Sequence, residues 1–183
     1  MVEFAVKGTK PKDHKFPIIS WGIRLLTWAK ISHVLLDFAR ENTVFHVYFN
    51  DGRFEPRTKY LKSTTVEYNI RIQTNAKRYD DIMRSCERRT SIQKGYYFHL
   101  LGITLCLPFR LFKVKVRNPF AEMNKSRTCS QMIAEIFLEN GQLKEAIEAL
   151  PVHLTNITEM DIINILLENQ GIQGEFNIIV TNH

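Results

Sequence analysis

The chain has 183 residues, of which 44% are hydrophobic and 24% are charged. This composition is typical of a soluble globular protein with one core, and it excludes a disordered chain. No apolar run is long enough to cross a bilayer, and the first residues show no signal-peptide pattern, so we expect no transmembrane segment and no signal peptide. The net charge of +6 favours anionic partners, but the basic residues are scattered, and solubility is the simpler interpretation.

The first half of the chain alternates between helical and extended patterns. We expect a helix over 17–30, strands over 33–38 and 44–49, a turn at 50–54, a strand over 66–72 and a helix over 75–89. The strand over 66–72 alternates apolar and polar residues, which is typical of a half-buried strand.

The second half is expected to be mainly helical. Residues 96–109 predict a buried helix or turn, 109–116 a strand, 127–141, 142–150 and 158–171 helices, and 175–180 a last strand. Thr158 and Asp161 form a capping box at the start of one helix. The sequence therefore predicts a single α+β domain over residues 1–183, with a core at about 18–170, in which an antiparallel sheet packs against helices.

Two histidines occupy the expected hairpin of the strands at 33–38 and 44–49. The apolar residues of both strands must share the face that packs on the core, so His33 and His46 lie together on the opposite face. A turn centred between Ala39 and Arg40 places them directly opposite each other. A turn one residue later pairs His33 with Tyr48 and leaves His46 diagonal. Two histidines on a solvent-facing strand surface need no function, which is the alternative interpretation.

Cys129 differs from the other two cysteines, Cys86 and Cys106, which lie in apolar patterns typical of a core. It follows a polar stretch and stands at the first turn of the helix expected over 127–141. A helix N-terminus lowers the pKa of a thiol, which makes it a better nucleophile. An odd number of cysteines without close pairing predicts a reducing compartment and no disulfide framework. No cysteine has metal-ligand spacing, so we expect no metal. The nucleophilic thiol chemistry considered next needs no organic cofactor, so we expect none.

A thiol at a helix start, a histidine at a strand start and a second polar group on the next strand match the logic of thiol–imidazole catalysis. The stretches "ISHVLLDF", "VFHVYFNDGRF" and, about 95 residues later, "RTCSQMIAEIF" resemble the circularly permuted branch of the NlpC-like, papain-like superfamily. That branch includes lecithin retinol acyltransferase-like and YiiX-like proteins and many bacteriophage proteins. The resemblance covers about residues 18–170 and is strongest for the bacteriophage members.

The resemblance implies a permuted papain-like fold and assigns roles to three residues. Cys129 would be the nucleophile, His33 the general base, and His46 the third residue that orients His33. Glu55 is a rival for the third position if the hairpin register is shifted. The sequence departs from relatives at Gln131, where Glu is common.

The resemblance also implies a thiol-dependent amidase or peptidase that hydrolyses an amide bond in a peptidoglycan peptide or a protein, or an acyltransferase. Its setting would be a host cytoplasm or a virion. A catalytically inactive binding or virion structural module is the alternative, because fold does not dictate function. A nucleic-acid-binding protein ranks last, because the basic residues of the expected strands alternate with apolar ones. Substrate identity and oligomeric state stay open.

Overall fold

A computed structural model describes residues 1–12, 24, 30–48, 51–90, 96–124, 127–171 and 176–180. The side chains of Tyr48, Asp51, 96–100, Leu107, Leu111 and 122–124 are outside this description. The helix expected over 17–30 falls almost entirely outside the described residues. None of the helices in the described part is long and apolar enough to cross a membrane.

Six antiparallel strands form one sheet in the order β4-β3-β2-β1-β5-β6. In chain order they are β1 (Val2–Pro11), β2 (His33–Phe38), β3 (Thr43–Tyr48), β4 (Asp51–Pro56), β5 (Thr64–Thr74) and β6 (Phe176–Val180). The expected α+β class with an antiparallel sheet is confirmed. The strands expected at 33–38, 44–49, 66–72 and 175–180 are present, with β5 longer than expected.

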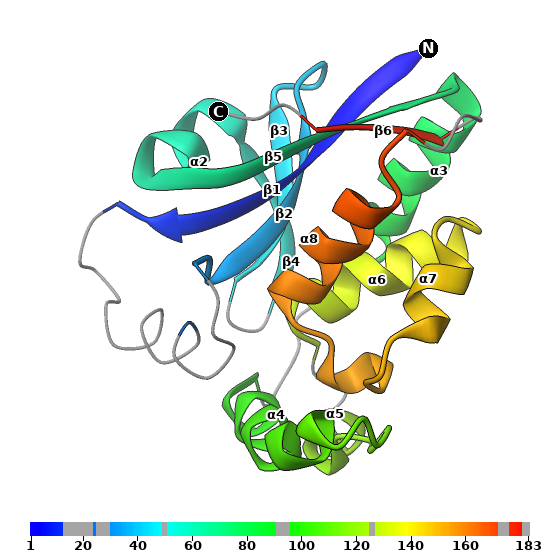
Figure 1. Ribbon diagram of the computed structural model, residues 1–183. Coiled ribbons are helices and arrows are strands. Elements are labelled where there is room, and N and C mark those ends of the chain that lie inside the picture. The colour runs from blue at the N-terminus through cyan, green and yellow to red at the C-terminus, as the bar shows by residue number, and fades with distance from the viewer. Residues whose placement is uncertain are drawn as a thin grey trace.

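Helices cover the sheet and extend below it (Figure 1). They are α2 (Arg57–Ser63), α3 (Ala76–Glu87), α4 (Tyr96–Leu111), α5 (Pro119–Asn124), α6 (Cys129–Glu139), α7 (Lys144–Ala149) and α8 (Glu159–Glu168), with a short 3-10 turn η1 at Leu154–Asn156. Buried side chains of α3, α6 and α8 meet one face of the sheet in the main hydrophobic core. The helices expected at 75–89, 127–141, 142–150 and 158–171 are confirmed as α3, α6, α7 and α8.

Two expected elements are wrong. Residues 51–56 form strand β4 and not a turn, because Phe54 pairs with Phe45 and a Cβ on Gly52 would lie 2.4 Å from the Arg89 carbonyl oxygen. Glycine is required there by close packing. Residues 109–116 are not a strand: 109–111 end helix α4, and the next residues have no partner strand in the described part of the chain. The alternation of apolar residues continues, but Val114 is exposed.

The second face of the sheet is also covered, contrary to the alternative interpretation in which the two histidines lie on a solvent-facing surface. Helix α2 lies against this face, and its Tyr60 ring is 4.6 Å from the ring of His46. Lys7 and Asp37 are both buried here and form an ion pair of 2.6 Å. The sequence did not predict strand β1, which lies at the centre of the sheet. This strand pairs with β2 and so places Lys7 next to Asp37.

Candidate thiol site at the start of helix α6

The first turn of helix α6 is fixed by hydrogen bonds from several directions. The Thr128 hydroxyl is the N-cap and accepts a hydrogen bond of 3.2 Å from the Gln131 backbone N–H. The Ser130 hydroxyl donates a bond of 2.9 Å to the carbonyl oxygen of Ile157, just before helix α8. Cys129 is therefore held at the N-terminus of α6, as the sequence predicted, and α8 is tied to the same place.

The thiol of Cys129 meets two distant parts of the chain. Its Sγ donates a hydrogen bond of 3.3 Å to Oε1 of Glu159, the first residue of α8. The backbone N–H groups of Val34 and Ser130 interact with the same sulfur and favour its thiolate form. Val34 directly follows His33 in strand β2, so the structure brings the helix with the thiol to the strand with the histidine.

Burial raises the pKa of Cys129 well above its ordinary value, and the Glu159 carboxylate raises it further. The backbone N–H groups oppose this shift but do not outweigh it. The sequence predicted a lowered pKa for this thiol from the helix N-terminus, with Lys125 and Arg127 acting in the same direction, and that expectation is wrong for this closed arrangement. The side chain is only 2% exposed, so the cost of desolvating a thiolate exceeds the benefit of the helix dipole.

Glu159 is a site residue that the sequence did not reveal. Burial raises the pKa of its carboxyl to about 7, although its own backbone N–H and the Cys129 thiol favour the charged form. The capping box of Thr158 and Asp161 is present, and its N-cap residue Thr158 directly precedes Glu159, where α8 begins. The capping box was the one sequence signal that could have drawn attention to Glu159, because it places this acid at a helix N-terminus. Only the tertiary packing shows that Glu159 contacts the Cys129 thiol.

The histidines adopt the later of the two registers considered for the hairpin. Leu36 is opposite Phe45, so His46 is diagonal to His33 and not directly opposite. Their rings still meet edge to face, with centroids 5.6 Å apart. The Tyr60 ring lies against both, at 6.3 Å from His33 and 4.6 Å from His46. The two histidines therefore form one cluster on the second face of the sheet.

Both imidazoles are neutral at physiological pH. Burial lowers the pKa of His33 to about 4. Burial also lowers the pKa of His46, to about 2, with further contributions from His33 and Arg53. The Nε2 atom of His33 is buried and has no hydrogen-bond partner among the described residues. A neutral imidazole with an unpartnered nitrogen can accept a proton, but a pKa of about 4 makes His33 a weak base in this closed arrangement, because an efficient general base has a pKa near the operating pH.

His33 and Cys129 are not hydrogen-bonded to each other in the described structure. Neighbouring residues of a strand point to opposite faces, so the His33 ring lies with His46 while the Val34 side chain lies in the main core. The thiol meets the strand at the backbone of Val34, between these two faces. An approach of the imidazole to the sulfur therefore requires a side-chain movement at the start of β2.

Glu55, the rival third residue, contacts His46. Its Oε1 lies 3.8 Å from His46 Nε2 and 2.9 Å from an Arg53 guanidinium nitrogen. Because the pKa of His46 is so low, this contact is not an ion pair. The structure places His46 next to His33 and Glu55 behind His46.

Gln131, the departure from the related pattern, is buried at the same helix end. Its amide nitrogen donates a hydrogen bond of 2.9 Å to Glu135, one turn along α6, and its Oε1 has no hydrogen-bond partner among the described residues. All three cysteines are free, and Cys86 and Cys106 are buried as expected. Across the described ranges, no group of three His, Cys, Asp or Glu residues is arranged to hold a metal ion.

Comparison with known proteins adds no relative. No protein-family model, curated protein or solved structure matches this chain. The resemblance to the permuted NlpC-like branch therefore depends on the short motifs around His33, His46 and Cys129 alone.

Proposed function

We propose that the chain is a thiol-dependent acyl-transfer enzyme of permuted papain-like type, most simply an amidase or peptidase, with Cys129 as its nucleophile. The observation that carries the proposal is the contact between the Cys129 sulfur and the backbone of Val34, beside His33. This contact joins the start of α6 to the start of β2, the pairing that thiol–imidazole chemistry needs.

The proposed reaction begins with attack of the Cys129 sulfur on the carbonyl carbon of an amide. A carbon–sulfur bond forms, and the thiol proton passes to the neutral imidazole of His33, which then protonates the leaving amine as the carbon–nitrogen bond breaks. Water hydrolyses the thioester, or another acceptor takes the acyl group. The backbone N–H of Cys129 at the helix start would stabilise the oxyanion. His46 would keep the His33 ring in place.

In this proposal, Glu159 acts in the resting protein, before substrate binds. It accepts the hydrogen bond of the thiol and, when ionised, raises the thiol pKa, so it keeps Cys129 protonated until substrate arrives. The switch of the thiol from Glu159 to His33 would accompany binding, since catalytic hydrogen bonds often tighten only in the substrate complex.

A specific observation also favours a second function. The thiol is buried and bonded to Glu159, and His33 Nε2 has no partner in the described part of the chain. The same observations fit a papain-like module that binds a partner without catalysis. In that case Cys129 is a buried helix-cap residue, and its replacement by Ala changes stability only.

The discriminating experiment traps the acyl-enzyme. The full chain is incubated with p-nitrophenyl acetate and, separately, with purified peptidoglycan peptides, and the acylated residue is located by peptide mass spectrometry. We expect an acyl group on Cys129, and none in Cys129→Ala. Cys86→Ala is the matched control, because Cys86 is a buried thiol of α3 outside the site. If neither compound acylates the protein, or if acylation does not depend on Cys129, the non-catalytic binding module is the better description.

A further inference from the structure

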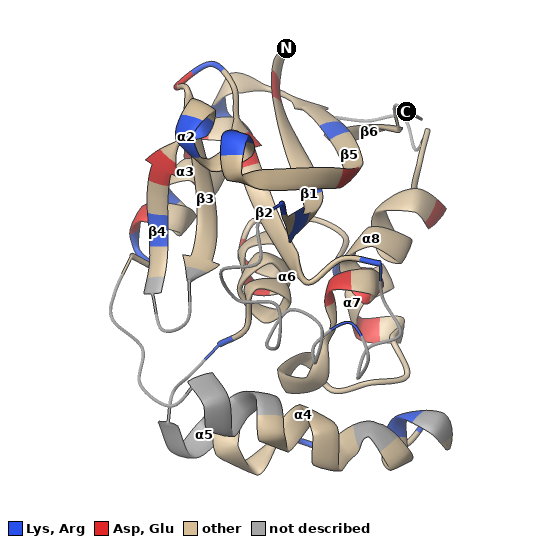
Figure 2. Ribbon diagram, turned by 90° about the vertical axis from the view of Figure 1, so that its left-hand side faces the viewer, with Lys and Arg blue, Asp and Glu red and all other residues tan. Residues whose placement is uncertain are grey.

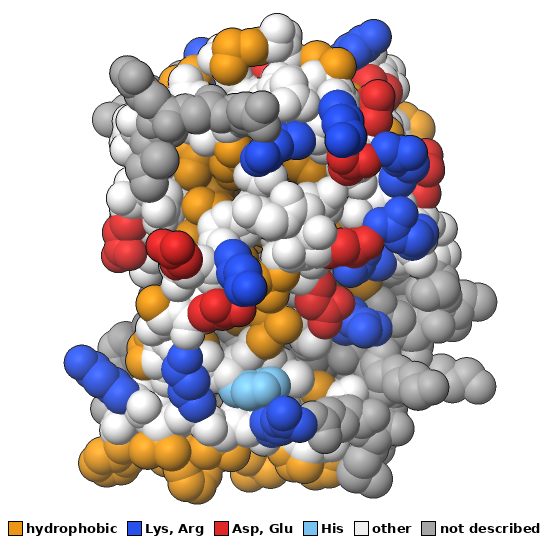
Figure 3. All heavy atoms as spheres, turned by 90° about the vertical axis from the view of Figure 1, so that its right-hand side faces the viewer, with side chains coloured by type: hydrophobic (Ala, Val, Ile, Leu, Met, Phe, Trp, Pro, Cys, Tyr) orange, Lys and Arg blue, Asp and Glu red, His pale blue; other side chains and the backbone are white. Residues whose placement is uncertain are grey.

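Helix α4 and the residues after it present an apolar face that nothing in the described structure covers. The large hydrophobic side chains exposed in the described part of the chain are Leu101, Leu105, Phe109, Phe112 and Val114, apart from Met1 at the terminus. Since a helix turns about 100° per residue, the three that lie within α4 fall in an arc of about 80°. Figure 1 places α4 at the lower end of the molecule, and Figure 3 shows a continuous hydrophobic surface along that end.

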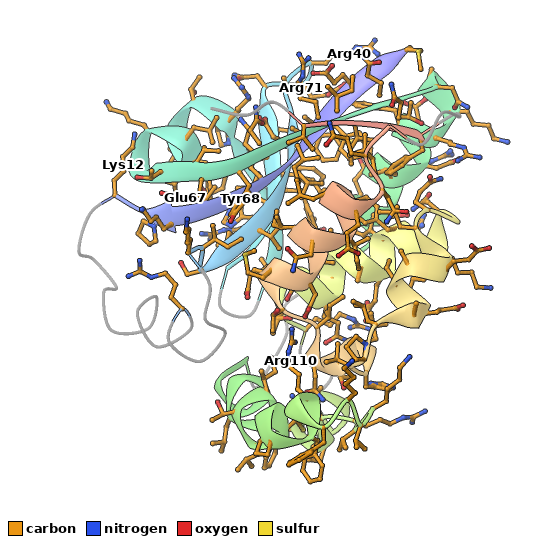
Figure 4. The ribbon with its side chains drawn as sticks, in the orientation of Figure 1. Lys12, Arg40, Glu67, Tyr68, Arg71 and Arg110 are labelled. Atoms are coloured by element: carbon orange, nitrogen blue, oxygen red, sulfur yellow. The ribbon has the colours of Figure 1, made fainter. Side chains whose placement is uncertain are left out.

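The opposite side of α4 is firmly packed, so the apolar face is directed outward. Ile103 and Cys106 are buried. A Cβ on Gly102 would lie 1.9 Å from Oδ1 of Asn118, which shows how closely the helix approaches the next segment. Arg110 binds the Asp161 carboxylate through both terminal nitrogens, at 2.9 and 2.6 Å, and lies on the side of α4 toward α8 (Figure 4).

The charged residues of α4 and of the segment between α4 and α5 are all basic. Residues 96–121 contain Arg110, Lys113, Lys115 and Arg117 and no Asp or Glu. The last three are exposed, and Lys115 donates to the neutral carbonyl oxygen of Glu148, so its charge is retained. Figure 2 shows basic but no acidic positions along α4, and basic side chains lie just above the hydrophobic edge in Figure 3.

We propose that this face binds the surface of an anionic lipid bilayer. Apolar side chains on one side of a helix, with Lys and Arg beside them, insert into the headgroup region while the cations meet lipid phosphates. A second copy of the chain fits less well, because a two-fold interface would bring the same basic rim against itself. Figure 1 places α4 at the end of the molecule away from α2, so the helix reaches a surface without the sheet in the way.

The test is cosedimentation of the full chain with vesicles of phosphatidylcholine alone or mixed with phosphatidylglycerol. We expect binding to the mixed vesicles that weakens as salt rises. Leu105→Asp/Phe109→Asp should abolish binding, and Lys113→Gln/Lys115→Gln should weaken it on the order of tenfold or more. Lys59→Gln/Lys62→Gln is the matched control, because it removes the same charge from exposed positions of α2 and should bind as the wild type does.

Circular dichroism of each variant shows that the fold is kept, which is expected at exposed positions. Absence of binding to mixed vesicles overturns the proposal. Equal loss in the α2 control also overturns it, because the effect would then come from net charge. Sedimentation equilibrium tests the remaining alternative, which is self-association. If the wild type forms a dimer and does not bind vesicles, and Leu105→Asp/Phe109→Asp dissociates that dimer, then this face is a dimer interface.

Discussion

The thiol of Cys129 and the carboxyl of Glu159 share a hydrogen bond of 3.3 Å although 30 residues separate them in the chain. Helix α6 starts at the thiol and helix α8 starts at the carboxyl, so two helix N-termini meet at one buried point. Both groups have raised pKa values, because burial disfavours the thiolate and the carboxylate alike. This pair sets the resting state of the candidate site.

Replacement of Glu159 should make the thiol more reactive. Above pH 7 the carboxylate raises the thiol pKa through its charge and its hydrogen bond, so Glu159→Gln should lower that pKa. We expect faster alkylation of Cys129 by iodoacetamide at pH 8 in Glu159→Gln than in the wild type, measured by peptide mass spectrometry. The rate for Cys86 in the same samples is the internal control. Slower alkylation of Cys129 would show that Glu159 assists the thiol.

The same replacement should change how stability depends on pH. The folded-state pKa of Glu159 is raised from 4.5 to about 7, so the folded protein holds this proton more tightly than the unfolded chain. The contribution is fully present below pH 4.5 and is lost as pH rises to 7. We expect Glu159→Gln to gain about 3 kcal/mol in the free energy of unfolding relative to the wild type across this interval.

Urea unfolding at several pH values measures that difference. His33 and His46 also titrate, and their lowered pKa values make both proteins less stable as pH falls below 6.5, but they are common to both and cancel. A stability difference that stays constant from pH 4.5 to 7 would refute the raised pKa of Glu159.

The buried ion pair of the second face should be costly to break. Asp37 accepts from Lys7 at 2.6 Å and from Arg57 Nε at 2.8 Å. Asp37→Ala leaves the buried ammonium of Lys7 without its partner and should cost about 3–5 kcal/mol. Lys7→Met/Asp37→Leu should recover most of this loss in thermal unfolding. Glu67→Ala, which breaks the exposed pair with Lys10, is the control and should cost under about 1 kcal/mol.

Gly102 should be required for helix α4 to pack closely against Asn118. Any Cβ at this position meets the Asn118 side chain, whose Oδ1 accepts from the Phe120 and Ala121 backbone N–H groups at the start of α5. Gly102→Ala should therefore destabilise the protein by about 1–3 kcal/mol through overpacking. Gly141→Ala is a useful comparison, because a Cβ there meets nothing and only its positive φ of 67° opposes it. A neutral effect of Gly102→Ala would contradict the close approach.

Local signals predicted the elements that carry the site. The alternation over 33–38 and the cap followed by an apolar stripe at Cys129 determine β2 and α6 without help from distant residues. The hairpin register could only be narrowed to two possibilities, because apolar parity is satisfied by both. The structure selects the one in which His33 and His46 are diagonal.

Features set by distant residues were not predictable in this way. Asn, Asp and Gly at 50–52 have turn chemistry, yet 51–56 pair with β3 as strand β4, and the Arg89 carbonyl oxygen lies too close to Gly52 for a side chain. Strand β1 carries Lys7 and Gly8, which hide its central position. Glu159 looks like an ordinary acid at a helix start, and only the packing of α6 near α8 brings it to the thiol.

The most direct test of the nucleophile is the rate at which the ester substrate p-nitrophenyl acetate acylates each cysteine in the wild type and in His33→Ala, because the thiol is expected to leave Glu159 for His33 only when substrate binds. If Cys129 attacks with His33 as its base, Cys129 should react faster than Cys86 and Cys106, and His33→Ala should slow it by about 100-fold or more. Tyr68→Ala, a change in strand β5 outside the histidine cluster, should leave the rate within about twofold. A rate for Cys129 equal to that of the two core thiols, or unchanged by His33→Ala, would contradict the catalytic role.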